Sequence, residues 1–507
     1  MVLQTSEIAD TPPTRRSRAA RVPPDGLAGP IRVLGIGGPV LLALYMASMF
    51  LPMAFVIGGL RITPYAGLLI IFIGPMFLAF LNDRTNRFVA LDFFMVAHVG
   101  WMALAVLYTE GLSRGVFVVN TALTSLGGYM IGRVLIRGPG DYERFFRYFF
   151  YGLLFYLPFA VLELLTKQVP VRDFLRLIAE VDFRPNNARV GLNRVQAFLE
   201  HPITYGMFCS IGVANLYYIY RGRWFKRASR TGTAVIMTLL SLSSAPTIAL
   251  GIQFALISWD RMLKGVRHKW VGLLLIVAVT VSVLHLASPH GLVGLVIDNL
   301  SYESETGWAR VEIFDYGSAE VMRHPFFGIG FAEWIRPFWR NSSVDNFWLV
   351  VAMRYGLPAL FFLLGGLAIH AVRIMSRRDL SEEWAGLRMG YVAAWAGVVF
   401  VLATVHIWGT AYIFIMTYMG AGAWLYTTPT PPTRYRRIGE IRDSGAGVRA
   451  ATGAGQTAET PPRRPARGTI PTGPRGGPES GPDSGAGKRH HPSGRAGLPR
   501  NPTGPRP

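Results

Sequence analysis

Residues 88–108 read FVALDFFMVAHVGWMALAVLY, an apolar run in which Asp92 is the only formally charged side chain. As an α-helix, a run of this length spans about 30 Å, which is the thickness of the hydrocarbon core of a bilayer. Basic residues precede it in segment 82–87, and further apolar blocks occupy residues 39–60 and 271–287. The repetition of such blocks predicts an all-α polytopic membrane protein.

The composition of the whole chain agrees with this interpretation. Of its 507 residues, 51% are apolar and only 16% are charged, whereas ordinary globular chains carry about 25% charged residues. The net charge of +21 lies in the N-terminal arm, in short loops between apolar blocks and in the C-terminal region. This placement is typical of the positive-inside rule. Because no nucleic-acid-binding motif accompanies the charge, nucleic acid is not an expected partner.

No sequence motif indicates a metal ion or another cofactor. The sequence contains no Walker motif, no Asp-x-Asp pair and no His-rich cluster. Its single cysteine, Cys209, lies inside an apolar block, where a packing role is expected. We therefore expect chemistry that needs neither a metal nor a cofactor.

The apolar blocks predict twelve membrane spans. With the N-terminus inside, the basic loops 82–87, 137–147 and 221–230 all fall on the cytoplasmic side. We therefore expect a multi-pass protein of the bacterial inner membrane with both termini in the cytoplasm. The predicted spans cover residues 36–58, 63–81, 88–109, 115–136, 145–166, 201–220, 231–243, 246–259, 270–287, 344–372, 388–407 and 410–427.

The block 231–259 must cross the membrane an even number of times, because basic loops precede and follow it. Residues 241–246, Ser-Leu-Ser-Ser-Ala-Pro, supply a break. Proline removes a helical hydrogen bond, and serine side chains satisfy the freed backbone groups. We expect two short segments here; a single kinked span is the alternative.

Two polar regions flank the membrane domain, which we assign to residues 33–427. The N-terminal arm, 1–32, carries Arg15, Arg16, Arg18, Arg21 and Arg32 among prolines. The tail, 428–507, is rich in Pro, Gly, Arg and Thr, with 14 basic residues against 5 acidic ones. Neither region has enough apolar surface to offset its ordering entropy, so both are predicted to be disordered.

The first long external segment, 167–200, is basic although it lies on the non-cytoplasmic side. Apolar residues recur at helical spacing in its first part, which predicts an interfacial amphipathic helix with Arg172 and Arg176 on the polar face. Its later part contains Arg184, Arg189 and Arg194. Guanidinium groups bind phosphate bidentately, so a phosphate-bearing ligand would explain them. Contacts with lipid headgroups or acidic side chains are the alternative.

The second long external segment, 288–343, is the longest connection between predicted spans. It contains Arg310 and the sequence His324-Pro-Phe-Phe-Gly-Ile-Gly, and the chain re-enters the membrane after Asp345-Asn346. A carboxylate at this boundary is costly unless it is solvated or paired. Asp345 and Asn346 are therefore candidates for a site, with helix capping as the alternative.

In their order and spacing, these motifs resemble the O-antigen ligase and polymerase family, and most closely the polymerases of lipid-linked exopolysaccharide. The resemblance covers about residues 190–360 of a twelve-span chain. It is carried by Arg194 with His201-Pro-Ile-x2-Gly206, by Ser241-Leu-Ser-Ser-x-Pro, by Arg310 with His324-Pro-x2-Gly328-x-Gly330, and by Asp345-Asn346-x-Trp-Leu with Arg354-Tyr-Gly356.

The resemblance implies a metal-independent, inverting glycosyltransferase that polymerises undecaprenyl-diphosphate-linked oligosaccharides on the periplasmic face. It implies lipid-linked sugars and membrane lipids as partners, together with other polysaccharide assembly proteins. Arg194 and Arg310 would engage the diphosphate, with Asp345 as first and His324 as second choice of general base. The expected substrate-binding residues are Arg184, Arg189, Glu200, His201 and Asn346.

Three other functions remain open at this point. Ligases of the family typically carry histidine before the asparagine of the re-entry motif, where this chain has Asp345, so a polymerase is favoured over a ligase. A transporter or lipid-sugar flippase would instead predict inverted repeats and charged groups at mid-membrane. A non-catalytic assembly partner acting through its tail is the third alternative.

Overall fold

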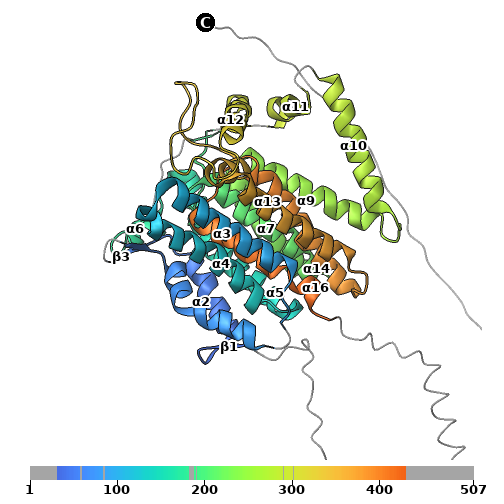
Figure 1. Ribbon diagram of the computed structural model, residues 1–507. Helices are drawn as coiled ribbons and strands as arrows, with labels where there is room; N and C mark the ends of the chain where they lie inside the picture. The colour runs from blue at the N-terminus through green and yellow to red at the C-terminus, as the bar shows by residue number, and fades with distance from the viewer. Residues whose placement is uncertain are drawn as a thin grey trace, which may run out of the picture. The chain divides into compact units, whose positions relative to one another are not determined.

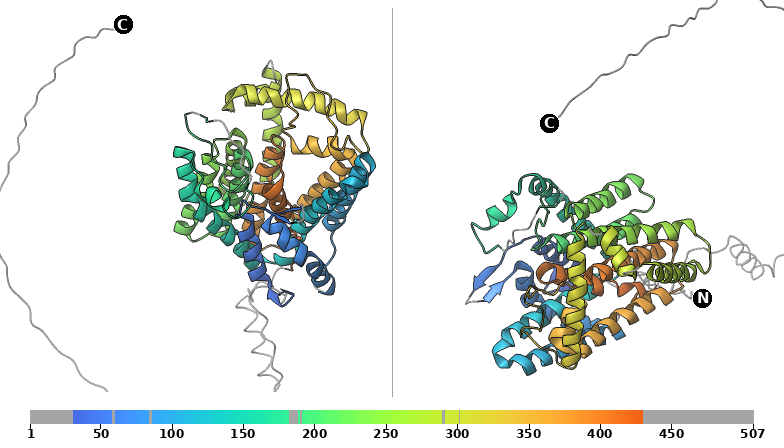
Figure 2. Two further views of the ribbon diagram at one scale, coloured as in Figure 1. Left: turned by 90° about the vertical axis from the view of Figure 1, so that its left-hand side faces the viewer. Right: turned by 90° about the horizontal axis from the view of Figure 1, so that it is seen from above.

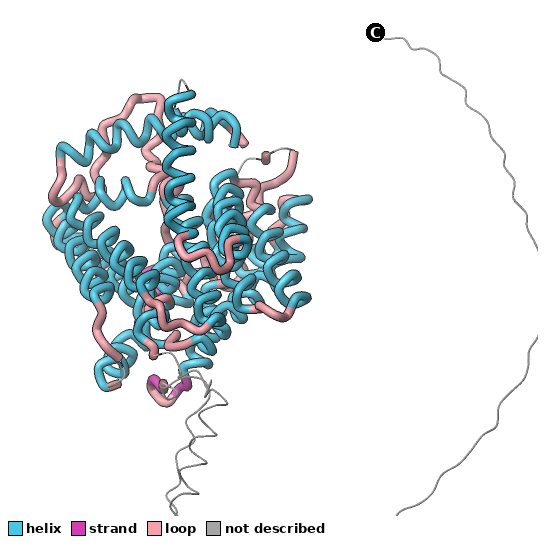
Figure 3. Tube along the Cα trace, turned by 90° about the vertical axis from the view of Figure 1, so that its right-hand side faces the viewer, coloured by secondary structure: helices cyan, strands magenta, loops and turns pink. Residues whose placement is uncertain are grey.

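Helices form almost all of the regular structure in the computed structural model, which describes residues 31–57, 60–83, 86–181, 188–189, 191–288, 291–300 and 302–429 (Figure 3). Seven helical segments are long and apolar enough to cross a membrane, so the prediction of an all-α membrane protein is confirmed at this level. Nearly all of the predicted arm and tail lie outside the described residues. The seven segments are Pro64–Asn82, Ala90–Glu110, Leu112–Leu135, Pro139–Thr166, Lys269–Ala287, Phe347–Ser376 and Glu382–Leu402.

The first half of the chain contains strands β1 (Arg32–Val33), β2 (Ile36–Gly37), β3 (Phe55–Ile57) and β4 (Leu60–Ile62), and helices α1 (Gly38–Met49), α2 (Pro64–Asn82), α3 (Ala90–Glu110), α4 (Gly115–Leu135), α5 (Pro139–Thr166), α6 (Pro170–Leu175) and α7 (Pro202–Ile219). The second half contains α8 (Trp224–Leu240), α9 (Ser244–Met262), α10 (Lys269–Ala287), α11 (Gly291–Leu300), α12 (Ser304–Arg323), α13 (Phe347–Ser376), α14 (Glu382–Leu402), α15 (Gly409–Ala421) and α16 (Trp424–Thr427).

Helices α7 and α15 form the centre of the bundle (Figure 1). Both are apolar around their whole circumference and buried along most of their length, as expected of helices surrounded by others. α7 packs against α8 and α14, and α15 packs against α4. The rings of Phe208 of α7 and Phe414 of α15 pack against each other at an angle of 42°, with centroids 4.3 Å apart. Helix α12 lies across one end of this bundle (Figure 2).

Helix α10 stands away from the bundle (Figure 1). None of its residues is buried, although it is one of the most apolar helices of the chain. An exposed helix with apolar residues on every face is suited to lipid rather than to water. This exposure supports the membrane assignment independently of helix length.

The predicted span 36–58 is wrong as a single helix. Helix α1 is only 12 residues long, or about 18 Å, and β3 then pairs antiparallel with β4. Pro52 follows the helix end, and the sequence Phe55-Val-Ile favours a strand because β-branched and aromatic residues fit a pleated surface. Ala54 also pairs with Glu180 through two backbone hydrogen bonds of 2.8 and 3.0 Å, which ties this hairpin to the segment after α6.

The predicted break in block 231–259 is confirmed. Helix α8 ends at Leu240 and α9 begins at Ser244, so the alternative of one kinked span is wrong. Between them, Leu242 adopts a left-handed conformation with φ of 44°. Ser241 and Ser243 donate hydrogen bonds to the carbonyl oxygens of Thr238 and Ser241, at 2.7 and 3.0 Å. The serines therefore satisfy backbone groups that the break leaves free, as expected.

The predicted amphipathic helix after residue 167 is oriented differently from the expectation. Helix α6 has only six residues, and Arg172 is 1% exposed while Phe174 is 64% exposed. Arg172 donates hydrogen bonds to the carbonyl oxygens of Ala197, at 2.6 Å, and Leu199. Buried carbonyl groups require donors, and this requirement outweighs the apolar periodicity that the prediction relied on.

The interruption of α13 at Gly356 is filled by the segment that begins at His324-Pro325. Gly356 has φ of 83° and ψ of 169°, which breaks the helical hydrogen-bond ladder. The backbone N–H of Ile329 donates to the carbonyl of Met353, and that of Leu357 donates to the carbonyl of Pro325, both at 2.7 Å. The glycine at position 356 therefore has a structural reason, since a side chain there would overlap the carbonyl oxygen of Phe326.

Replacing Gly356 with alanine is expected to destabilise the fold by about 1–3 kcal/mol, because its φ lies in the left-handed region and the added methyl group overlaps backbone atoms. The matched control is Gly100→Ala in α3, where an added methyl group meets no atom within 4 Å. This change is expected to be neutral or to stabilise by less than about 1 kcal/mol. Thermal unfolding of both variants in detergent measures the difference, and equal midpoints would contradict the expectation.

Candidate functional site

The two predicted external segments meet at one end of the helix pair α3 and α13. Glu110, the last residue of α3, accepts a hydrogen bond of 2.7 Å from the backbone N–H of Phe331 in the second segment. At the other end of the pair, Arg87 and Arg373 line a common cavity with the basic loops. The basic loops predicted to be cytoplasmic and the segments predicted to be external thus gather at opposite ends of the bundle.

Arg194 lies where the first external segment meets the break between α8 and α9. Its Nη2 donates a hydrogen bond of 2.9 Å to Oγ of Ser243. Its Nε is buried and has no hydrogen-bond partner among the described residues. Burial, together with the positive charges of Arg189 and Arg310, lowers the pKa of Arg194 to about 10, and the negative charge of Glu303 opposes this shift. The guanidinium of Arg194 therefore has donor capacity in excess of its observed contacts.

Arg189 joins the two external segments. It forms an ion pair of 2.9 Å with Glu303, just before α12, and donates to the carbonyl of Leu242 at 3.1 Å. The side chain of Arg189 is only 13% exposed. Nearby, Oγ of Ser244 accepts a hydrogen bond of 2.7 Å from the backbone N–H of Tyr302. These contacts hold α12 over the break between α8 and α9.

Arg310 of α12 is close enough to Arg194 and to Asp345 for their charges to interact. Burial lowers its pKa, the carboxylate of Asp345 opposes this effect, and the charge of Arg189 adds to it. The Nε of Arg310 is a second buried donor that lacks a partner within the described residues. Arg310 is thus within electrostatic range both of the other arginines and of the carboxylate, and the three arginines form one cationic cluster.

Asp345 lies at the wall of a cavity of about 700 Å³. Burial raises its pKa above the ordinary value of 3.8, and the positive charge of Arg310 opposes this rise. His201, Arg354 and His406 line the same cavity. Burial lowers the pKa of His406 to about 4, and the charge of Arg354 contributes, so His406 is neutral at ordinary pH.

Of the nine site residues proposed from the sequence, two, His201 and Asp345, are among the residues that line this cavity. His324 is half-exposed and lies 3.7 Å from Glu320 of its own helix. Glu200 lines a different cavity, beside Arg61 and Tyr65. Arg184 lies outside the described residues. His324 and Glu200 therefore do not line the cavity that Asp345 and His201 line.

Two proposed residues also cap helices. Oδ1 of Asn346 accepts a hydrogen bond of 3.1 Å from the backbone N–H of Leu349 at the start of α13. Nδ1 of His201 accepts one of 3.2 Å from the N–H of Ile203 at the start of α7. Capping was the alternative considered for the Asp345-Asn346 pair, and it applies to Asn346. Asp345, one residue earlier, faces the cavity.

A buried glutamate holds the segment that presents Arg194. The carboxylate of Glu163, at the end of α5, accepts hydrogen bonds from the N–H groups of Gln196 at 3.1 Å and Ala197 at 3.0 Å. Arg172 binds the carbonyl groups of the same segment from the other side. Residues 196–199 are therefore fixed by charge-assisted hydrogen bonds, which set the position of Arg194 and of His201.

Sequence reasoning missed two groups of the cavity. Arg354 was used only as part of a motif, although a charge inside an apolar span is itself a signal of function. His406 lies near the end of the predicted span 388–407, so the same signal applied to it. Within the described ranges, no three His, Cys, Asp or Glu side chains gather in a group that could hold a metal ion.

No family model and no curated protein matches the sequence of this chain.

Proposed function

We propose that this protein is a periplasmic-face glycosyltransferase that polymerises lipid-linked oligosaccharide repeat units. The observation that carries the proposal is the electrostatic influence of Arg310 on Arg194 and of Asp345 on Arg310, together with the position of Asp345 in the wall of a large cavity. Two residues 116 positions apart in the sequence are thus both available to one polyanionic ligand. A pyrophosphate group fits two guanidinium forks with unused donors.

The proposed topology has twelve crossings, with both termini in the cytoplasm of a bacterial inner-membrane protein. The crossings are assigned to α1–α5, α7–α10 and α13–α15, so that segments 167–200 and 288–343 face the periplasm. The pairing of Ala54 with Glu180 supports an external position for the hairpin after α1. The short helices α1 and α15 would cross together with adjoining extended residues.

In the proposed reaction, Arg194 and Arg310 hold the diphosphate of an undecaprenyl-diphosphate-linked donor. A hydroxyl group of the acceptor sugar gives its proton to Asp345 and attacks the anomeric carbon. The new carbon–oxygen bond forms as the bond to the diphosphate breaks, with inversion, and the electron pair leaves with the phosphate. Negative charge grows on the leaving group, so the fixed guanidinium groups stabilise the transition state more than the ground state.

The raised pKa of Asp345 is compatible with a general base, because a base works best when its pKa approaches the working pH. The positive charge of Arg310 opposes this rise in the pKa and favours the ionised carboxylate. His201 and Arg354 border the cavity and are candidates for orienting the sugars. His324 is no longer favoured as a base, because it lies away from this cavity.

Reconstitution with a radiolabelled lipid-linked repeat unit tests the proposal. The purified full-length protein is expected to produce longer lipid-linked chains without other proteins, and to do so equally with and without a chelator. Transfer of chains to a lipid acceptor only would identify a ligase, which uses the same chemistry with a different nucleophile. Translocation across vesicles without new glycosidic bonds would identify a flippase and contradict the proposal.

A further inference from the structure

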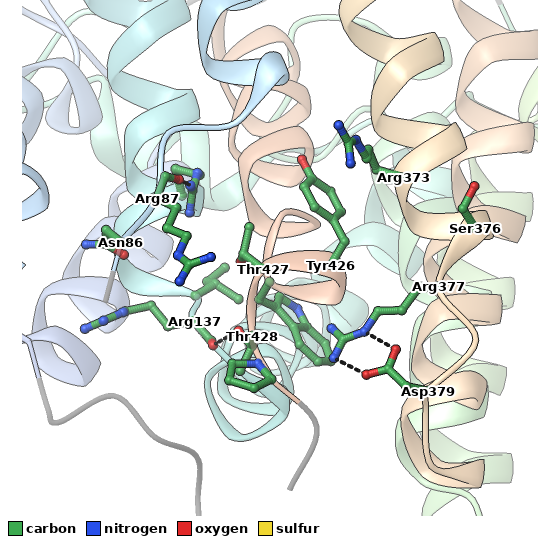
Figure 4. Close-up of a pocket in the computed structure, with 14 residues that line it drawn as sticks. Asn86, Arg87, Arg137, Arg373, Ser376, Arg377, Asp379, Tyr426, Thr427 and Thr428 are labelled. Atoms are coloured by element: carbon green, nitrogen blue, oxygen red, sulfur yellow. Dashed lines mark hydrogen bonds and ion pairs between the residues drawn. The ribbon is translucent and has the colours of Figure 1, made fainter. Parts of the chain in front are cut away.

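A second large cavity lies at the end of the bundle opposite to the Asp345 cavity. Its volume is about 750 Å³, and its wall comes from the loop before α3, the ends of α4 and α13, and the residues of and after α16. Arginines dominate the wall: Arg87, Arg133, Arg137, Arg373 and Arg377. Figure 4 shows Arg87 and Arg137 on one side of Thr427, with Arg373 and Arg377 on the other.

The positive charge of this cavity is only partly compensated. Arg87 and Arg373 have no acidic partner among the described residues, which leaves an excess of about two positive charges. The other three arginines form ion pairs, Arg133 with Asp92 at 3.1 Å, Arg137 with Asp83 at 2.6 Å and Arg377 with Asp379 at 2.9 Å. A cluster of like charges held this closely favours an anionic ligand.

A smaller cavity of about 300 Å³ continues from the first one. The two share Arg87, Arg373, Tyr426 and Thr427. The remaining wall of the smaller cavity is mainly apolar and comes from the start of α3 and the last turns of α13: Phe88, Val89, Ala90, Leu91 and Ile369, with His370. Arg87 and Arg373 therefore line both cavities and adjoin apolar residues at the start of α3.

We propose that this double cavity binds an anionic phospholipid, with the phosphate between Arg87 and Arg373 and the first acyl methylenes along the apolar wall. Guanidinium forks match phosphate oxygens, and basic pockets between transmembrane helices are suited to anionic headgroups. A soluble phosphate would use the same arginines but would leave the apolar wall without a function.

The net charge of the chain's own tail does not favour it as the source of the missing negative charge. Thr428 and Pro429 line the cavity at the point where the tail begins, but residues 428–507 carry 14 basic and 5 acidic side chains. The N-terminal arm is basic as well. Both terminal regions are therefore poor sources of counter-charge, and the leaflet at this end of the bundle is the source that we favour.

A phosphate bound here would join α3, α13 and the residues after α16. We therefore expect phosphatidylglycerol to raise the thermal unfolding midpoint of the full-length protein in detergent, because a ligand that binds only the folded state stabilises it. Phosphatidylcholine, which has no net charge, serves as the lipid control, and inorganic phosphate tests a soluble source. Retained lipid is counted by native mass spectrometry.

The test variant is Arg87→Gln with Arg373→Gln, which removes both unpaired charges. Loss of two charge-assisted contacts should weaken phosphatidylglycerol binding by about tenfold or more. The matched control is Arg223→Gln with Arg267→Gln, which removes the same charge from two exposed loop positions. Measurements in moderate salt reduce the nonspecific contribution of the tail and arm, which is screened more strongly than a contact in a cavity.

Lower binding in the test variant and unchanged binding in the control would support the site. Equal binding in both, or equal stabilisation by phosphatidylglycerol and phosphatidylcholine, would overturn it. Stabilisation by inorganic phosphate to the same extent as by lipid would overturn the lipid assignment. If the test variant does not fold, Arg87→Lys with Arg373→Lys keeps the charge but removes the forks, and wild-type binding by that variant would also count against the proposal.

Discussion

Arg194→Ala and Arg310→Ala are each expected to lower the rate of polymer formation by roughly 10²–10³-fold, the usual cost of losing one fixed donor to a developing negative charge. Both guanidinium groups lie in the cationic cluster at the break between α8 and α9, and both carry a buried Nε without a partner among the described residues. The effect should appear mainly in kcat, because the leaving diphosphate gains charge in the transition state. The rate is measured from the growth of polymer length over time on labelled repeat units.

Arg176→Ala is the matched control for this experiment. Arg176 belongs to the same external segment as Arg194, but it is partly exposed and paired with Asp173 at 2.7 Å. Its loss should change polymer formation by less than a few-fold. Normal polymer from both Arg194→Ala and Arg310→Ala, at wild-type protein levels, would remove the basis of the proposed glycosyl transfer.

Replacing Arg194 with lysine tests whether its positive charge or the planar geometry of its guanidinium group matters for activity. Arg194 also donates to Ser243, so a lysine keeps the positive charge but loses one of the planar donors. We expect an intermediate rate for Arg194→Lys. Full activity would indicate that Arg194 contributes only its charge, and the same rate as for alanine would indicate that the guanidinium fork is essential.

Much of the fold could be predicted because the length of each apolar run is read directly from the sequence. Segments such as 88–109 needed no tertiary information, and their helices end within a few residues of the predicted bounds. The break at 241–246 was also visible, because proline and serine act locally on the backbone. Helix α1 was predicted too long, since the pairing of β3 with β4 competes with an apolar helix that the composition alone favours.

The arginines of the candidate site could be identified from the sequence, but the contacts that bring them together could not. Arg194 and Arg310 stand out because charge on an external segment is unusual, whereas their proximity depends on the ion pair between Arg189 and Glu303. The inward orientation of Arg172 depends on carbonyl groups 25 and 27 residues further along the chain. Contacts of this kind arise from tertiary structure and leave no periodic signal in the sequence.

Asp345→Asn is expected to lower polymer formation by roughly 10²–10⁴-fold, the usual contribution of a general base. The amide keeps the shape of the side chain but accepts no proton from the acceptor hydroxyl. His324→Ala is the control, because His324 is half-exposed at the end of α12 and outside the Asp345 cavity. A larger loss of activity from His324→Ala than from Asp345→Asn would indicate that His324, and not Asp345, is the general base.

The pH dependence provides an independent test of the same carboxylate. Burial raises the pKa of Asp345 above 3.8, so protonation should abolish activity at a higher pH than for an ordinary aspartate. The rate should therefore fall as the pH decreases through this raised pKa. Because the charge of Arg310 opposes the rise, the residual activity of Arg310→Gln should fall at a still higher pH. An acidic limb that stays in place in Arg310→Gln would show that the titrating group is not Asp345, since only a carboxylate coupled to Arg310 is expected to respond.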